Sequence, residues 1–180
     1  MKLSPKAKHI VDQLNTKNTK LGDVRTIAKD IKKDHELAME LWTTELYFPR
    51  QLGILILDKK LLTQEVINQL DKDIQKHNED EKLQLIDWLM ANQLAKDKKT
   101  VALMESWQNS PSNLQRRTFW YHQARLRWVG QAPPPNTEEL LSFIEKQIKN
   151  EVPEVQWAMN FTAAQIGVFQ PEYRERCIKL

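Results

Sequence analysis

Apolar residues recur at intervals of three and four along almost the whole chain of 180 residues, and this pattern constrains the fold more than any other feature. Between Gly22 and Lys33, four apolar side chains fall on one face of a helix: Val24, Ile27, Ala28 and Ile31. Only four glycines are present, and the Asn-Gly and Asp-Gly pairs typical of β-hairpins are absent. The sequence therefore predicts an all-α protein.

Short polar or proline-containing breaks divide this pattern into separate helices. The expected helices start near Ser4 and cover about 22–33, 35–44, 49–57, a segment capped by Thr63, about 81–96, 100–109 and 113–129, a segment capped by Thr137, about 153–168, and a last segment from Pro171. The segment 130–136 contains three consecutive prolines, so we expect a loop there.

The helices are expected to form pairs with a regular period. The second helix of each pair begins near Phe48, Glu81, Asn113 and Pro153, a spacing of roughly 32 to 40 residues. This period is typical of HEAT-like helical hairpins, so we expect an α-α superhelix whose second helices line a concave face. We expect one such domain over residues 1–180. Because the sequence ends inside the last expected helix, we also expect a missing C-terminal segment.

The charge is modest in total and unevenly distributed. The net charge is +3, from 27 basic and 24 acidic residues. Acidic residues crowd near 71–81, whereas the segment 113–129 carries four arginines and no acid. Because a polyanion could dock on such a one-sided surface, double-stranded DNA is the expected partner.

Several classes of function have no support in the sequence. The single cysteine, Cys177, excludes a disulfide within the chain and fits a reducing, cytoplasmic setting. The histidines lack ligand spacing, and HExxH, GxGxxG, Walker and GxSxG motifs are absent, so we expect neither metal nor cofactor. The longest apolar stretch, Leu52–Leu57, is too short to cross a membrane. We expect a cytoplasmic monomer that associates with the nucleoid when bound to DNA.

Unusual polar residues fall on the second helices, where they would face one groove: Arg50, Asp87, Arg116 and Arg117, with Trp157 at the comparable place in the last pair. A guanidinium suits phosphate because its planar fork can bond two oxygens. Asp87 lies among apolar neighbours, where a carboxylate could stabilise a developing cation or activate water. The alternative for Asp87 is a salt bridge or an N–H cap between repeats.

The expected long helix combines arginines with aromatic residues. Arg116 and Arg127 are eleven positions apart, so they would lie on one stripe of that helix. The aromatic residues interleaved with the arginines are Phe119, Trp120, Tyr121 and Trp128. Basic groups interleaved with aromatic rings fit a nucleic-acid surface. The alternative is that the rings belong mostly to the core and the arginines are mostly solvated.

Three stretches of the sequence are similar to a known family. Leu21–Lys29 (LGDVRTIAK) is similar to the family's early helix, and His35–Trp42 (HELAMELW), continuing through Arg50 and Leu55–Leu62, is similar to its second repeat. Leu114–Arg117 (LQRR) is similar to its Leu-Gln-Arg element. On these residues, the chain resembles the AlkD-like DNA alkylation repair family of DNA glycosylases over nearly its whole length.

The resemblance implies a HEAT-like superhelix that holds duplex DNA in its concave face and hydrolyses the N-glycosidic bond of N3- or N7-alkylated purines without flipping the base. It implies that Asp87 stabilises the oxocarbenium-like sugar and positions water, while Arg116 contacts a phosphate. The two family tryptophans that face the cationic nucleotide fall on Leu83 and Phe161. Phe161 could still offer a π-face, whereas Leu83 offers none.

The site residues expected from these arguments divide into one catalytic residue and a DNA-binding set. Asp87 is the expected catalytic residue. The expected DNA-binding residues are Arg116, Arg117, Arg50, Phe161, Trp157, Trp120 and Arg127. Two alternatives to a glycosylase stay open. Leu83 and Phe161 allow a DNA-binding relative with little or no excision activity, and the modest net charge allows a HEAT-type scaffold for protein interactions.

Overall fold

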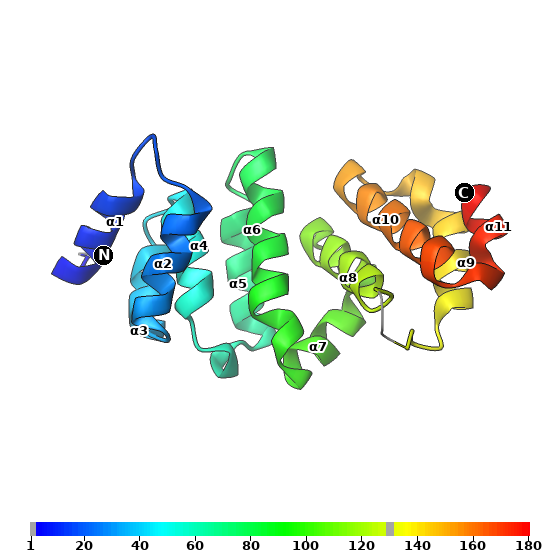
Figure 1. Cartoon of the computed structure of the whole chain (residues 1–180), viewed down its shortest axis with the longest axis horizontal. Coiled ribbons are helices and arrows are strands. Elements are labelled where there is room, and N and C mark those ends of the chain that lie inside the picture. Colours follow the sequence, from blue (N-terminus) through cyan, green and yellow to red (C-terminus); the bar gives the residue numbers. More distant parts are fainter. Residues whose placement is uncertain (1–2, 129–131) are drawn as a thin grey trace. The chain divides into compact units, whose positions relative to one another are not determined.

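The computed structural model describes residues 3–128 and 132–180, and every regular element within them is a helix, so the expected all-α class is confirmed (Figure 1). The α-helices are α1 (Pro5–Leu14), α2 (Leu21–Ile31), α3 (His35–Trp42), α4 (Tyr47–Ile56), α5 (Gln64–Ile74), α6 (Glu79–Asn92), α7 (Lys98–Glu105), α8 (Asn113–Arg125), α9 (Thr137–Gln147), α10 (Pro153–Phe169) and α11 (Arg174–Ile178). The 3-10 helices are η1 (Lys59–Leu61), η2 (Leu94–Lys96), η3 (Ser106–Asn109), η4 (Ile148–Asn150) and η5 (Pro171–Tyr173).

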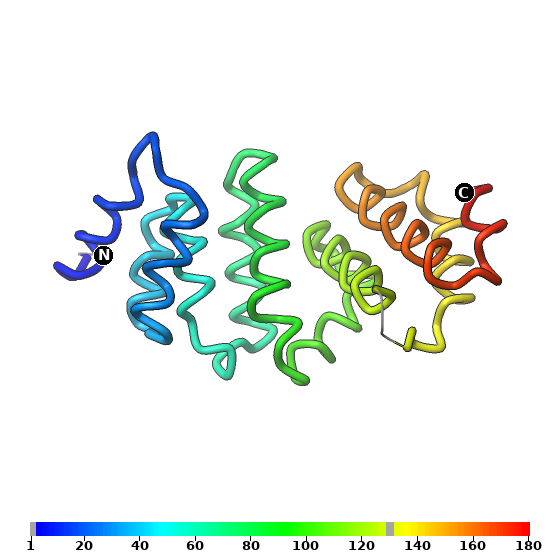
Figure 2. Tube along the Cα trace, in the orientation of Figure 1, coloured from blue at the N-terminus to red at the C-terminus, as the bar shows by residue number. Residues whose placement is uncertain are grey.

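The helices pack into two compact units, with the boundary between Val101 and Ala102 inside α7. Unit 1 comprises the helices before this boundary, and unit 2 comprises those after it. In unit 1, α4 lies between α2 and α6 and packs closely on α3. The chain reverses direction between α5 and α6, which form an antiparallel hairpin (Figure 2).

A glycine allows the close approach of α3 and α4. A Cβ placed on Gly53 would lie 3.0 Å from the carbonyl oxygen of Ala38, which is tighter than nearly all real Cβ contacts. The core around this crossing is aliphatic. Its fully buried members include Leu41, Leu52, Ile54, Ile56, Leu85 and Leu89. The i, i+3, i+4 pattern of the sequence thus marks the side of each helix that faces this core.

Side-chain caps begin several helices where the sequence predicts them. The Ser4 hydroxyl accepts from the Ala7 amide at 3.1 Å, with Pro5 at the first helical position. The Thr63 hydroxyl caps α5 in the same way. The predicted cap at Thr137 is wrong. Asn136 is the N-cap of α9, and the Thr137 hydroxyl instead donates to Gln170 Oε1 at 3.0 Å.

Helices α6, α7 and α8 each end four residues earlier than the periodicity predicts. α6 ends at Asn92, and the side chain of the next residue, Gln93, turns inward and donates through Nε2 to the carbonyl oxygen of Ile54 at 2.6 Å. α8 ends at Arg125, four residues before the predicted end at 129. Residues 129 to 131, where the expected helix ended and the expected loop began, lie outside the described residues.

Unit 2 is built on the packing of α8 against α10. The Trp120 side chain is fully buried, and the Thr162 hydroxyl on α10 donates to the Trp120 carbonyl oxygen at 2.7 Å. α9 and α11 also pack on α10. The Arg176 guanidinium on α11 reaches Glu138 at 2.5 Å and Glu145 at 2.7 Å on α9.

Candidate nucleic-acid interface

In unit 1, a stripe of polar and aromatic side chains runs along α6. Gln84, Asp87 and Trp88 are spaced by three and four residues and therefore share one side of the helix. Asp87 is half-buried there. The Trp88 indole N–H donates to the Gln51 carbonyl oxygen on α4 at 3.2 Å, and the Arg25 guanidinium from α2 lies 5.1 Å from the Trp88 ring. Asp87 therefore belongs to a surface to which α2, α4 and α6 all contribute.

A tyrosine ties α4 to this stripe. The Tyr47 hydroxyl donates to Gln84 Oε1 at 2.5 Å and accepts from Gln51 Nε2 at 2.8 Å. Burial, with the charge of Glu81, raises the pKa of Tyr47, so the hydroxyl stays protonated at neutral pH. The side chains beside Asp87 are thus held by hydrogen bonds between neighbouring helices. Neither Tyr47 nor Arg25 was among the predicted site residues, because their contacts with Gln84 and Trp88 join residues far apart in the chain.

The structure places Arg50 inside unit 1, with only 2% of the residue exposed. Its Nε donates to the Trp42 carbonyl oxygen at 3.1 Å, and its Nη1 lies 2.9 Å from the Asp73 carbonyl oxygen and 2.7 Å from His77 Nε2. The guanidinium also lies 4.9 Å from the Trp42 ring. This geometry favours a structural role, because Arg50 could contact DNA only after leaving these partners. Its DNA contact stays a prediction.

In unit 2, four side chains from α8 and α10 form an aromatic–basic cluster: Arg117, Tyr121, Trp157 and Phe161. The Trp157 and Phe161 rings are stacked at 5.3 Å with a 12° angle between planes, and Tyr121 meets both edge-on at 5.7 and 5.6 Å. The Arg117 guanidinium lies 4.5 Å from the Trp157 ring. Because Trp157 is 48% exposed, the cluster reaches the surface of unit 2.

This cluster joins three residues that the sequence placed in the DNA-binding set, namely Arg117, Trp157 and Phe161. Tyr121 belongs to the same cluster but not to the predicted set. Its spacing of four residues from Arg117 would have placed it on the same side of α8. Of the rings that the sequence interleaves with arginines, Phe119 and Trp120 are buried, as the alternative to a nucleic-acid surface expected, but Arg117 is 5% exposed and therefore not solvated as that alternative also expected.

Arg116 lies near the start of α8, and its charge is already paired. The guanidinium bonds Glu151 through Nε at 3.0 Å and Nη2 at 2.9 Å, and Nη1 donates to the Ser110 carbonyl oxygen at 2.8 Å. Both side chains are mostly buried, at 18% and 14% exposed. A fork-to-carboxylate pair of this kind fixes the guanidinium plane. A phosphate that approached Arg116 would meet a guanidinium already neutralised by Glu151.

The two remaining predicted contacts, Trp120 and Arg127, are buried, at 0% and 1% exposed. Arg127 Nη1 donates to the Gln123 carbonyl oxygen at 2.9 Å, and Nη2 donates to Asn136 Oδ1 at 2.6 Å. Burial lowers the pKa of Arg127 to about 10. The predicted stripe shared by Arg116 and Arg127 is wrong, because α8 ends before Arg127. For both Trp120 and Arg127, a DNA contact stays a prediction that this burial disfavours.

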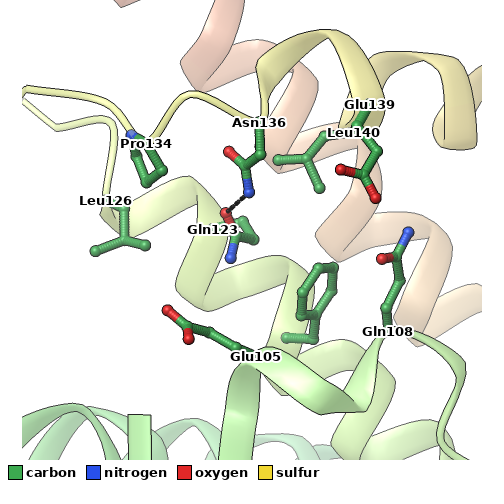
Figure 3. Close-up of a pocket in the computed structure, with 9 residues that line it drawn as sticks. Glu105, Gln108, Gln123, Leu126, Pro134, Asn136, Glu139 and Leu140 are labelled. Atoms are coloured by element: carbon green, nitrogen blue, oxygen red, sulfur yellow. Dashed lines mark hydrogen bonds between the residues drawn. The ribbon is translucent and has the colours of Figure 1, made fainter. Parts of the chain in front are cut away.

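The side chains that hold Arg127 also line a pocket of about 240 Å³ in unit 2 (Figure 3). Asn136 Nδ2 donates to Gln123 Oε1 at 3.1 Å across one wall. The other lining residues are Glu105, Gln108, Phe119, Leu126, Pro134, Glu139 and Leu140. Through its hydrogen bonds to Gln123 and Asn136, Arg127 therefore connects the start of α9 to the end of α8 next to this pocket.

Residues 3–128 and 132–180 contain no group of three or more His, Cys, Asp and Glu side chains that could hold a metal ion. In the same part of the chain, no helix has both the length and the apolar character needed to cross a membrane.

Comparisons with known proteins agree with this architecture. The family model described as DNA alkylation repair enzyme matches residues 4–179. One solved structure is similar to this chain, with 18% sequence identity and a TM-score of 0.72. The alignment covers 98% of this chain and 75% of the chain in that structure. That protein belongs to a family described as related to the HEAT-like repeat DNA glycosylases, with affinity for branched DNA structures. The likeness shows the HEAT-like fold. No curated protein matches the sequence.

Proposed function

Because this chain belongs to the DNA alkylation repair enzyme family, we propose that it binds duplex DNA and removes N3- or N7-alkylated purines by hydrolysing the N-glycosidic bond. Asp87 is the proposed catalytic carboxylate. The lesion base stays stacked, and the protein contacts the lesion through the sugar and the backbone. Neither a metal nor a cofactor takes part in this proposal.

The position of Asp87 carries the proposal. Its half-buried carboxylate lies between Gln84 and Trp88 on one side of α6, with the Arg25 guanidinium over the Trp88 ring. When the glycosidic bond of a cationic purine breaks, positive charge develops on the sugar. A fixed carboxylate lowers the energy of that transition state, and it can orient the attacking water. A partly desolvated site strengthens this interaction relative to bulk water.

The aromatic–basic cluster of unit 2 supports binding to the DNA backbone. The Arg117 guanidinium lies 4.5 Å from the exposed Trp157 ring, which belongs to the stacked pair of the cluster. Arg117 is only 5% exposed and its Nη1 donates to the Glu154 carbonyl oxygen at 3.0 Å, and Arg116 is paired with Glu151, so each arginine contributes to phosphate binding only after it gives up part of these contacts. Contacts of this type set affinity and register without reading the base sequence.

The test is release of methylated purines from alkylated duplex DNA under single-turnover conditions. Removing a group that stabilises developing charge typically slows the step by about 10²–10³-fold, so Asp87→Asn should lose that much excision while it keeps duplex binding. Asp80→Asn is the matched control, because Asp80 is an exposed acid in the first turn of the same helix. Full excision by Asp87→Asn would exclude Asp87 as the catalytic carboxylate.

A second candidate function is a DNA-binding member of the family that does not excise bases. Leu83, one turn before Asp87, supports it because an aliphatic side chain cannot offer a π-face to a cationic nucleotide. The branched-DNA affinity described for the structural relative supports it as well. Under this candidate, wild type binds DNA in a salt-dependent way and releases no base. Leu83→Trp would then create or raise excision if the missing ring is the cause.

A further inference from the structure

Three lysine-containing segments that lie far apart in the sequence converge on one pocket of about 320 Å³ in unit 1. The pocket lies where α2, α4 and α6 end, at the lower end of these helices in Figure 1. Its charged lining residues are Lys32, Lys33, Lys59, Lys60, Lys96 and Asp58. We name this feature the lysine pocket.

Little of this positive charge is neutralised within unit 1. Asp58, the one acid among the lining residues, pairs with Lys33 at 3.0 Å. Lys59 Nζ donates to the Lys96 carbonyl oxygen at 2.7 Å. Apart from Lys33, the lining lysines form no ion pair in the described part of the chain.

Helix ends do not account for the lysines. Each helix C-terminus carries roughly half a negative charge, so the ends of α2, α4 and α6 supply about −1.5 in total. Five lysines against one aspartate and these three helix ends leave a surplus of about 2.5 positive charges. Lysines present only to complement the helix dipoles would not exceed the charge they complement.

The backbone of Lys32 adds an independent observation. Lys32 is the C-cap of α2 and has a φ of 67°, in the left-handed region that favours glycine. A non-glycine residue in such a sparsely populated conformation stores about 1–3 kcal/mol of strain. Glycine at this position would relieve the strain, and lysine instead adds one more charge to the lining of the pocket.

We infer that the lysine pocket binds backbone phosphates of the DNA on one side of the nucleotide held at Asp87, an inference that rests on the proposed function. Asn92, which lines the pocket, lies five residues beyond Asp87 on α6, so the two are about 8 Å apart along the helix axis. A strand that runs along α6 advances 3.4 Å for each nucleotide, and in that orientation the pocket would lie about two to four nucleotides from the reacting sugar.

The chemistry of lysine favours a DNA backbone over a small ligand. An ammonium on a long flexible stem acts as a point charge and lacks the planar fork that recognises one fixed anion geometry. Several such groups around an open pocket suit successive phosphates whose positions vary. The lysine pocket is therefore expected to contribute affinity and register, and to leave the excision step unchanged once DNA is bound.

The first test compares two triple variants in duplex binding measured by fluorescence anisotropy over a series of salt concentrations. The pocket variant combines K32Q, K60Q and K96Q. The control variant combines K8Q, K17Q and K72Q, which remove the same charge from exposed positions elsewhere in unit 1. Each lost phosphate contact lowers the slope of log K against log salt by about 0.9, so the pocket variant should lose about 2 to 3 in slope and at least about tenfold in affinity at low salt.

The second test locates the contact. Single methylphosphonate substitutions, which are neutral, are placed at each phosphate around a fixed lesion analogue. For wild type, affinity should fall at positions about two to four nucleotides to one side of the lesion, and these same positions should cease to matter for the pocket variant.

The outcomes separate the two proposals. Failure of wild type to bind DNA overturns the proposed function and the inference together. Binding by wild type, with the pocket variant equal to the control variant, overturns the inference and leaves the function standing. A pocket variant that binds weakly but excises normally at saturating protein concentration meets the expectation.

Discussion

Acid sensitivity of unit 2 is expected to centre on one buried histidine. His122 on α8 is 5% exposed, and neither ring nitrogen has a hydrogen-bond partner among the described residues. Burial, together with the charge of Arg125, lowers the pKa of His122 from 6.5 to about 4. The ring is therefore neutral in the folded protein at neutral pH. An unfolded chain would bind a proton at this position more readily.

The sign and size of the effect follow from this difference. Above pH 6.5 the imidazole is neutral in both states and contributes no pH dependence. As the pH falls from 6.5 towards 4, the unfolded state takes up the proton first, so the free energy of unfolding decreases. The full difference corresponds to about 3 kcal/mol, of which about 2 kcal/mol is lost by pH 5. Below pH 4 both states are protonated and this loss stops growing.

The assay is urea unfolding of wild type and His122→Leu at pH 7.5, 6 and 5, followed by circular dichroism. The carboxylates contribute equally to both proteins, so the difference in unfolding free energy between them isolates the histidine. That difference should shift by about 2 kcal/mol in favour of His122→Leu between pH 7.5 and pH 5. A constant difference over this range would refute the reasoning, because it would mean that His122 titrates alike in both states.

Four further substitutions test other parts of the structure. Gly53→Ala should lower the unfolding free energy by about 1–2 kcal/mol in thermal or urea unfolding, because the added methyl meets a backbone carbonyl at 3.0 Å. Gly22→Ala, which has open space around it, should instead stabilise α2 by about 0.5–1 kcal/mol. Glu151→Gln should release Arg116 from its ion pair and tighten duplex binding several-fold in anisotropy, with a steeper salt dependence; unchanged affinity would argue against a phosphate contact by Arg116. Trp157→Leu should weaken duplex binding by about three- to tenfold, because Arg117 loses the ring on which it lies.

Local signals in the sequence predicted the helices well. The apolar period requires only that one side of each helix be buried, and this requirement holds whatever the partner helix is. Caps such as Ser4 and Thr63 act within one turn, so their neighbours in sequence are also their neighbours in space. Helix ends were less predictable. The side chain of Gln93, directly after the end of α6, bonds a carbonyl on α4, which lies almost forty residues earlier.

The candidate site was only partly predictable, because the direction of a long polar side chain depends on distant partners. The sequence places Arg50 on the correct helix but cannot show that two carbonyl oxygens and His77 hold it inside. Glu151, the partner of Arg116, lies 35 residues later in the chain, between η4 and α10. The pairing of Arg117 with Trp157 was within reach, since both residues are on second helices and both were expected at one groove.

The attachment of the last helix has a consequence for its resistance to proteases. Arg176 fastens α11 to α9 through Glu138 and Glu145, whereas Ile178 is 73% exposed. Mobile ions weaken such surface pairs, since the distance over which charges act falls from about 10 Å at 0.1 M salt to about 3 Å at 1 M. The chain after α10 should therefore be trimmed by trypsin faster at high ionic strength, while the buried helices of unit 2 stay intact. Ionic strength would then govern how long α11 resists trypsin.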